Sequence, residues 1–161
     1  MTVLGLDIGG ANIKAGTTDG RTRSVPFPLW KHPERLAAML AELVAVFGDC
    51  DTVAVTMTGE LADCFTTKAE GVQHIASAVA QAAGLRRTRF WTTDGRFIAL
   101  QDVGQHTIAV AAANWHALAT WVGQRAATGS ALLIDIGTTT TDIIPLRDGR
   151  PVALGQPDRE R

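Results

Sequence analysis

Apolar residues near the start of the chain alternate with polar ones at the two-residue period of strands. This alternation predicts strands over residues 3–8 and 13–18, joined as a hairpin, and a third strand over residues 22–28. Pro26 and Pro28 indicate an edge strand or its frayed end. After Pro33 the spacing becomes helical, up to Gly48. The predicted buried stripe of this helix comprises Leu36, Met39, Leu40, Leu43, Val44 and Phe47.

Beyond this helix the pattern alternates strands with helices. The elements that it predicts are, in order, a central parallel strand over 52–57, a helix over 67–83, weaker strands over 89–92 and 97–98, and a long helix over 107–124 that ends before Gly129. Three antiparallel strands followed by this alternation predict an α/β fold with a mixed sheet and flanking helices. Ligands of such sheets bind beyond the carboxyl ends of the strands.

Two short phrases, one at each end of the chain, repeat the same design. Asp7 lies in LGLDIGGANIKAGTTDG and Asp135 lies in LLIDIGTTTTDIIPLRDG. In each phrase a carboxylate ends an apolar strand, a tight turn follows, and a second apolar run leads to Asp-Gly. Either phrase alone is compatible with an ordinary hairpin, but the repetition favours two half-sites that face one phosphorylated small molecule.

The turns carry groups that suit a phosphate. Glycines allow positive φ and a close approach of backbone N–H groups to an anion, which we expect at Gly9-Gly10 and at Gly137-Thr138. Because a carboxylate repels phosphate, we expect Asp7 and Asp135 to hold Mg²⁺, directly or through its waters. The predicted diphosphate-binding residues are Gly9, Gly10, Asn12, Lys14, Gly137, Thr138, Thr139 and Thr140.

A third polar segment, residues 56–68, leaves the predicted central strand. Glu60 is a candidate general base for a phenolic hydroxyl, and Lys68 is a candidate to neutralise a leaving pyrophosphate. Candidate substrate-binding residues in this segment are Thr58, Gly59 and Asp63.

The structural alternative is a solvated loop. In it Asp63 or Thr66 caps the next helix, and Lys68 pairs with Glu70 or with solvent. In the Ala-rich stretch near residue 114, Asn114 and Trp115 are second-rank candidates for substrate contacts. For Asn114 the alternative is a satisfied structural polar group, and for His116 that alternative is preferred.

Composition narrows the functional classes. The 161 residues have a net charge of −1, which argues against a general nucleic-acid binder. Asp7 interrupts the first apolar run, and no stretch is long enough for a membrane span, so we expect a cytoplasmic protein without a signal peptide. Cys50 and Cys64 lack metal-ligand spacing, and we expect both to be reduced thiols.

The two Asp phrases resemble the phosphate-1 and phosphate-2 loops of the acetate and sugar kinase, Hsp70 and actin superfamily. More narrowly, LGLDIGGANIKAG, VTMTGELADCFTTKAEGV, AAANWHALA and LLIDIGTTTTDIIPL resemble the hydantoinase/oxoprolinase-like proteins of tetrahydromethanopterin-linked C1 transfer. The resemblance covers residues 3–155 and implies a ribonuclease-H-like lobe of the actin-like ATPase type.

The resemblance also implies an activity. It points to a transferase of methanofuran biosynthesis, which joins an aminomethyl-furanmethanol diphosphate to a tyramine-type phenol and releases pyrophosphate. The roles of Asp7, Glu60 and Lys68 in catalysis are part of this expectation. Two alternatives stay open, namely an ATP-dependent hydantoinase/oxoprolinase or small-molecule kinase of the same superfamily, and a non-catalytic binding module.

Proteins of this type are longer and have a full second lobe. We therefore expect residues 1–128 to form the first lobe with the phosphate-1 loop, and residues 129–161 to begin a truncated second lobe with the phosphate-2 loop. Apolar positions of the second hairpin would then pack on the first lobe, self-associate or remain exposed. This predicts weak activity and a homo-oligomer formed through residues 131–155.

Overall fold

The computed structural model describes residues 1–126, 128–136 and 141–152. The chain divides into two compact units, Met1–Asn114 and Trp115–Arg161, called here the first and the second unit. The predicted lobe boundary after residue 128 stays a prediction. In the structure, the helix that precedes this position packs with the second unit.

The first unit is built on a six-stranded mixed sheet with the order β3-β2-β1-β4-β5-β6. The strands are β1 (Val3–Ile8), β2 (Asn12–Thr17), β3 (Thr22–Pro26), β4 (Thr52–Met57), β5 (Arg87–Trp91) and β6 (Phe97–Ala99). Strands β1, β2 and β3 form an antiparallel meander, β4 is parallel to both β1 and β5, and β6 is antiparallel to β5. The predicted α/β fold with a mixed sheet is confirmed.

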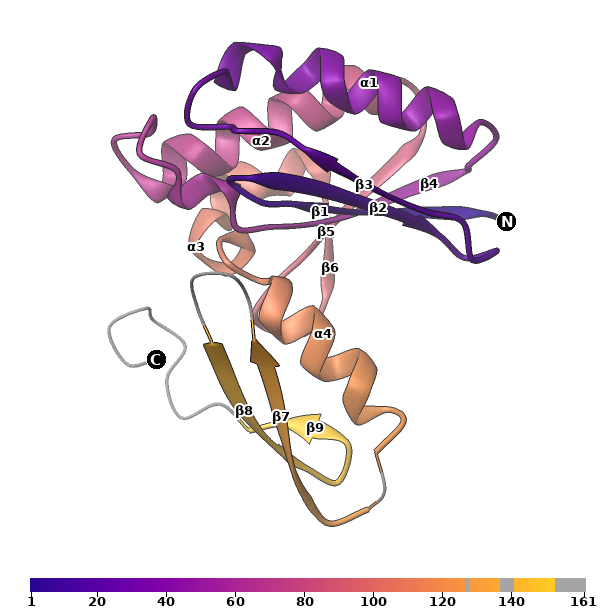
Figure 1. Ribbon diagram of the computed structural model, residues 1–161, viewed down its shortest axis with the longest axis vertical. Coiled ribbons are helices and arrows are strands. Elements are labelled where there is room, and N and C mark those ends of the chain that lie inside the picture. Colours follow the sequence, from indigo (N-terminus) through magenta and orange to yellow (C-terminus); the bar gives the residue numbers. More distant parts are fainter. Residues whose placement is uncertain (127, 137–140, 153–161) are drawn as a thin grey trace. The chain divides into compact units, whose positions relative to one another are not determined.

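Two helices cover one face of this sheet. They are α1 (Leu36–Phe47), entered through the 3₁₀ turn η1 (Pro33–Arg35), and α2 (Lys68–Ala83). Figure 1 shows them side by side above the strands, and their apolar stripes join the core cluster of the unit. Since side chains alternate along a strand, Leu4, Leu6 and Ile8 of β1 enter this core while Asp7 points to the other face.

The predicted long helix over residues 107–124 is wrong. After the 3₁₀ segment η3 (Leu100–Gln105), the chain forms the short helix α3 (Thr107–Val110), leaves the helical path, and restarts as α4 (Asn114–Gly123). Ala112 has a φ of 48°. Its N–H donates to the carboxylate of Glu60 and not to a carbonyl of the preceding turn. An Ala-rich sequence has high helix propensity, so the pattern alone does not reveal a break made by a distant side chain.

The predicted third strand also ends earlier than expected, at Pro26. Beyond it the chain turns to run beside the loop between β1 and β2. The N–H groups of Phe27 and Leu29 donate to the carbonyls of Ala11 and Gly10, at 2.8 and 2.9 Å. Pro28 lies between them and has no N–H to donate, so it does not interrupt this pairing.

The second unit contains α4 and a three-stranded antiparallel sheet. Its strands are β7 (Ser130–Ile136), β8 (Thr141–Arg147) and β9 (Arg150–Pro151), in the order β7-β8-β9. Trp115 and Ala119 of α4 pack with Ile144 and Leu146 of β8 in a small core. The predicted second hairpin is therefore confirmed.

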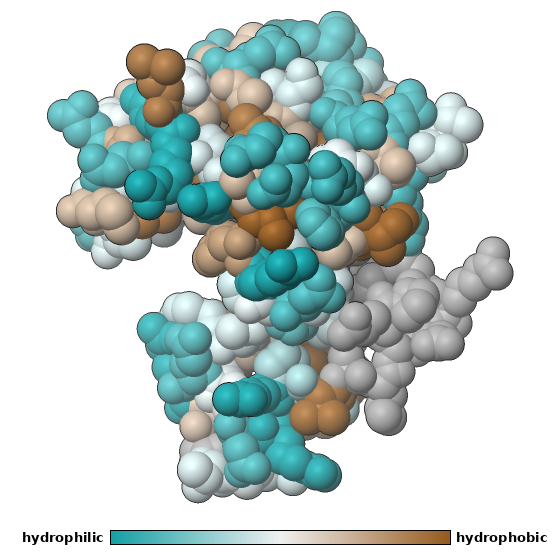
Figure 2. Space-filling model, turned by 180° about the vertical axis from the view of Figure 1, so that it is seen from behind, coloured by the Kyte–Doolittle hydropathy of each residue, from teal (hydrophilic) through white to brown (hydrophobic). Residues whose placement is uncertain are grey.

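One face of the second sheet is apolar but exposed. Among the apolar residues of the hairpin, Ile144 is buried and Leu133 packs against the small core, whereas Ile134, Ile136 and Ile143 are exposed. Hydrophilic residues cover most of the side of the molecule drawn in Figure 2. The expected self-association through residues 131–155 stays a prediction. Among the described residues, no helix is long and apolar enough to cross a bilayer.

Gly71 of α2 offers a test of the packing. A Cβ at this position would lie 2.7 Å from both Cα and O of Glu60, which is closer than atoms tolerate. Exchanging Gly for Ala in a helix ordinarily stabilises it by about 1 kcal/mol. We expect Gly71→Ala instead to lower the free energy of unfolding by about 1–3 kcal/mol, because the added methyl overpacks the junction.

Urea denaturation measures this change, and Gly104→Ala is the matched control. Nothing lies within 4 Å of a Cβ built on Gly104, so this exchange is expected to be neutral or slightly stabilising. Equal effects of the two substitutions would contradict the close packing of α2 on Glu60.

Candidate functional site

Asp7 lies in a row of polar residues that crosses three strands. In the register of the sheet it stands beside Lys14 of β2 and Thr56 of β4. The three side chains share the face of the sheet that α1 and α2 leave open, because each alternates with buried neighbours along its strand. Residues far apart in sequence therefore meet near the carboxyl ends of two parallel strands, where ligands of such sheets bind.

Asp7 and Lys14 form an ion pair with 3.4 Å between Oδ2 and Nζ. The Lys14 side chain is 67% exposed and that of Asp7 is 29% exposed, so the pair is screened by water and is worth at most about 1 kcal/mol. Beside it, the hydroxyl of Thr56 is buried and has no hydrogen-bond partner in the described part of the chain. The Asp7 carboxylate is accessible and already attracts a cation.

The turn after β1 is tight, but its glycines do not have the expected backbone angles. Neither Gly9 nor Gly10 has a positive φ, so that expectation is wrong. A side chain at Gly9 would be crowded for another reason, since its Cβ would lie 3.0 Å from the carbonyl oxygen of Asn12. The Gly9 N–H donates to the same carbonyl at 3.0 Å, which closes the turn. The predicted ligands Asn12 and Lys14 are both exposed.

The third polar segment lies directly beside this turn. The Thr58 N–H donates to the Ile8 carbonyl at 3.0 Å, and Gly59 opens the 3₁₀ turn η2 (Gly59–Leu61). A Cβ on Gly59 would lie 3.1 Å from the oxygen of Ile8 and 3.3 Å from that of Gly9. Within the first unit, the structure thus brings together the first and the third of the segments that the sequence singles out.

Glu60 is buried, with 2% of its surface exposed. Its Oε1 accepts the Ala112 N–H at 2.8 Å. A general base must come within hydrogen-bond reach of the proton that it removes. In this conformation the carboxylate lies inside the first unit, so the environment of Glu60 favours a role in holding the backbone.

Lys68 and Asp63 flank a well-formed helix start. The structural alternative placed the cap at Asp63 or Thr66, but Thr67 is the N-cap of α2 and its hydroxyl accepts the Glu70 N–H at 3.1 Å. Glu70 returns the interaction by accepting the Thr66 N–H at 2.9 Å. This is close to a capping box. Lys68 is the first helical residue and is partly buried, whereas Asp63 is exposed.

In the second unit, Asp135 stands opposite Asp142 on the neighbouring strand of the hairpin. Asp142 was not among the residues predicted from the sequence. A signal was present, because Asp142 directly follows the threonine run of the same Asp phrase. Like charges directly opposite repel one another. The expected phosphate ligands Gly137, Thr138, Thr139 and Thr140 lie outside the described residues.

Asn114 and Trp115 begin α4. Trp115 is buried in the small core of the second unit, where its ring lies 5.3 Å from that of His116. Its surroundings favour a packing role over a substrate contact. Cys50 and Cys64 are free thiols, as expected. Burial raises the pKa of the Cys64 thiol.

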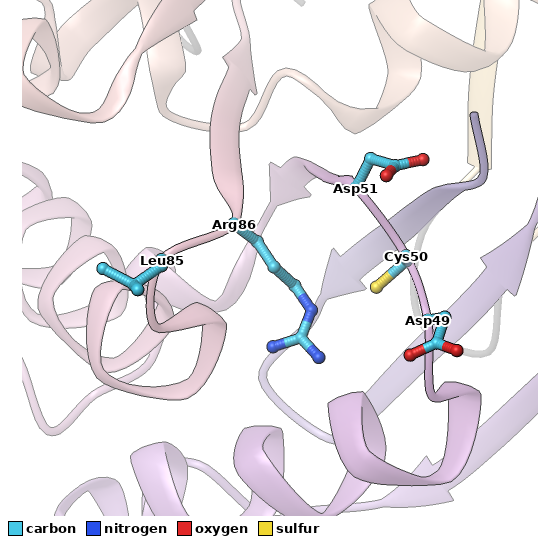
Figure 3. A pocket seen from close by; sticks show the side chains of 5 residues that line it. All are labelled: Asp49, Cys50, Asp51, Leu85 and Arg86. Carbon is cyan, nitrogen blue, oxygen red and sulfur yellow. The ribbon is translucent and has the colours of Figure 1, made fainter.

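A depression of about 560 Å³ lies at the opposite ends of the strands from Asp7, where β4 and β5 begin. Figure 3 shows its lining residues, Asp49, Cys50, Asp51, Leu85 and Arg86. The Arg86 guanidinium donates to the carbonyls of Ala83 and Gly48, at the ends of α2 and α1. A cation stabilises helix carboxyl ends, so Arg86 has a structural role.

The model of the hydantoinase/oxoprolinase family matches residues 51–158, most of the chain. The chain belongs to the hydantoinase/oxoprolinase family. The match begins just before β4 and so includes the whole third polar segment and the second Asp phrase, which confirms the predicted resemblance.

A curated relative from Methanocaldococcus jannaschii is 37% identical over an alignment of 157 residues, which covers 95% of this chain and 46% of the relative. It is the (4-{4-[2-(gamma-L-glutamylamino)ethyl]phenoxymethyl}furan-2-yl)methanamine synthase. The chain thus spans about half the length of the curated relative that it matches.

A solved structure, the Ppx/GppA family member of Aquifex aeolicus, aligns with 95% of this chain and 49% of its own, at a TM-score of 0.50 and 14% identity. At this identity the likeness concerns the fold alone. It supports the ribonuclease-H-like, actin-like ATPase fold of this hydantoinase/oxoprolinase family member.

The N-cap of α2, beside the candidate site, can be tested by single substitutions. We expect Thr67→Ala to lower the free energy of unfolding by about 1 kcal/mol, because the Glu70 N–H loses its acceptor. Thr66→Ala is the matched control, since only the backbone N–H of Thr66 takes part in the cap. Chemical denaturation of both variants decides the matter, and a larger loss for Thr66→Ala would disprove the assignment of the cap.

Proposed function

We propose that the chain is the phosphate-binding part of a transferase of methanofuran biosynthesis, in tetrahydromethanopterin-linked C1 metabolism. The enzyme would join an aminomethyl-furanmethanol diphosphate to a tyramine-type phenol. The observation that carries this proposal is the 37% identity to the synthase over 95% of the chain. The name of that relative describes a phenoxymethyl-furan, which is the ether that such a reaction forms.

The reaction is a displacement at carbon. The phenolic oxygen attacks the methylene carbon of the furanmethanol diphosphate, the new C–O ether bond forms, and the bond from this carbon to the diphosphate oxygen breaks. Pyrophosphate leaves with the bonding electrons, and the phenolic proton passes to a base. The largest barrier is the charge that develops on the leaving group, which positioned cations and N–H donors stabilise.

Asp7 and Lys14 are suited to the diphosphate. Mg²⁺ is bound in proteins through one or two carboxylates together with substrate phosphates and waters. The accessible Asp7 carboxylate, already 3.4 Å from a lysine ammonium, fits the first of these ligands, and Asp135 is proposed as the second. Bound Mg²⁺ would neutralise charge on the leaving pyrophosphate.

The lysines contribute cations of their own. Lys14 has an exposed side chain that can turn from Asp7 to a phosphate oxygen, and Lys68 stands at the first position of α2. The positive end of the helix dipole adds to this charge. Glu60 was proposed from the sequence as the base, but its burial favours the positioning role developed below.

A second candidate is an ATP-dependent hydantoinase or oxoprolinase. The observation that favours it is the family match itself, which covers residues 51–158. The two candidates differ in ligand, because one needs a nucleotide and the other a furanmethanol diphosphate. Isothermal titration of the chain with ATP, pyrophosphate and a furanmethanol diphosphate, each with Mg²⁺, separates them. Tight binding of ATP and none of the furan compound would reject the transferase.

Substitution of the two aspartates tests the phosphate loops. We expect Asp7→Asn and Asp135→Asn each to weaken Mg²⁺-dependent pyrophosphate binding by about tenfold, or about 1.4 kcal/mol, with the fold intact. Asp94→Asn, an exposed carboxylate in the turn between β5 and β6, is the control. Unchanged dissociation constants for both loop variants would mean that the two phrases do not form a phosphate site.

Lys14→Met should move two affinities in opposite directions. Removal of the ammonium relieves Asp7 of a competing cation, so Mg²⁺ alone should bind up to about fivefold more tightly, the limit set by an exposed ion pair. Pyrophosphate should bind more weakly, because a phosphate partner is lost. Titrations at low salt measure both constants, with Lys31→Met as control. If both constants stay at the parental values, Lys14 has no part in the site.

A further inference from the structure

The break between α3 and α4 is unusual for its sequence. Residues 111–113 are all alanine, the residue with the highest helix propensity, and they are flanked by helical residues on both sides. Ala112 nevertheless has a φ of 48°, a left-handed conformation that a residue with a Cβ disfavours. Local preferences therefore oppose the observed backbone, and a tertiary interaction must hold it.

The carboxylate of Glu60 supplies one such interaction, beside the hydrogen bond from the Thr93 N–H to the Ala109 carbonyl at 2.8 Å. Its Oε1 accepts the Ala112 N–H at 2.8 Å, in a part of the first unit where Glu60 and residues 111–113 are all buried. A hydrogen bond from a backbone N–H to a carboxylate is stronger than one to a carbonyl, and a buried setting strengthens it further. In a continuous helix the same N–H would bond to the carbonyl of Ile108, so the two acceptors compete.

Glu60 is itself held on two sides. Its neighbour Gly59 packs against the carbonyls of Ile8 and Gly9 in the turn that follows β1. On the other side, α2 approaches the Glu60 backbone so closely that only the glycine at position 71 fits. Glu60 therefore connects the turn beside Asp7 to the residues at which α4 begins.

We propose that Glu60 is a positioning residue, and that its hydrogen bond to Ala112, the Glu60–Ala112 latch, sets the start of α4. With the latch closed the segment is broken, as in the structure. With the latch open, residues 107–124 form the continuous helix that their sequence favours. A displacement of the turn beside Asp7 by a bound ligand reaches Glu60 through Gly59, so the latch couples that turn to the segment that leads into the second unit.

Amide hydrogen exchange on the full chain tests the latch directly. Glu60→Ala should speed exchange of the Ala112 amide at least tenfold and raise the helix content seen by circular dichroism. Glu60→Gln keeps an oxygen acceptor but loses the charge, so it should speed exchange by less than Glu60→Ala does. Glu42→Ala removes an exposed carboxylate from α1 and is the matched control. Parental protection of Ala112 in Glu60→Ala would overturn the proposal.

Ala112→Gly keeps the proposal testable if Glu60→Ala fails to fold. Glycine adopts positive φ without a steric cost and lowers helix propensity. It should therefore slow exchange at position 112 and raise the unfolding midpoint, after correction for intrinsic exchange rates. Faster exchange and a lower midpoint would show that the segment is helical in solution, and would overturn the latch.

A ligand measurement links the latch to the site, and only this part rests on the proposed function. With Mg²⁺ present, Glu60→Ala should weaken pyrophosphate binding about tenfold, and Glu60→Gln should weaken it less. Equal affinity of Glu60→Ala and the parent would remove the coupling to the turn. If the parent itself binds no pyrophosphate, the proposed function fails, while the exchange experiments still decide whether the latch exists.

Discussion

Strand β1 is paired on both sides, antiparallel to β2 and parallel to β4, and the arrangement of the first unit depends on this double pairing. The register places Asp7 level with Lys14 on one side and with Thr56 on the other. Because parallel strands end at the same edge, the turn after β1 and the 3₁₀ turn after β4 meet there. A one-residue shift of β4 would turn Thr56 into the core and Val55 out of it. The alternation of buried and outward-facing side chains along both strands therefore fixes the register that keeps Asp7, Lys14 and Thr56 side by side.

The elements with a clear period could be predicted from the sequence. Strands β1 and β4 and the helices α1 and α2 have apolar residues on one face, and burial follows that face. Asp7 and Thr58 could be placed near one another for the same reason. Both follow apolar strands that the α/β order makes neighbours. The expected reaction came from the family resemblance, because hydrophobic periodicity carries no information about chemistry.

Other features depend on single contacts, either local or between residues distant in sequence. These features could not be predicted from the sequence. The break at Ala112 is set by Glu60, which is distant in sequence, and nothing in the alanine run indicates it. The cap of α2 falls on Thr67 where several neighbouring residues were equally able to serve. At Gly9 the crowding comes from the closeness of Asn12 and not from the dihedral angle. In each case the feature depends on a contact in the folded structure, which neither composition nor hydrophobic periodicity reveals.

The burial of Trp115 has an optical consequence. The chain has four tryptophans and no tyrosine, so its near-ultraviolet emission comes from indole rings alone. Trp30 and Trp121 are exposed, and Trp91 belongs to β5 of the first unit, whereas Trp115 lies in the core between α4 and β8. An indole ring shielded from water emits at shorter wavelength than a hydrated one. Trp115 therefore contributes to the blue edge of the spectrum, and a red shift of its emission on heating would mark the point at which water reaches the core of the second unit.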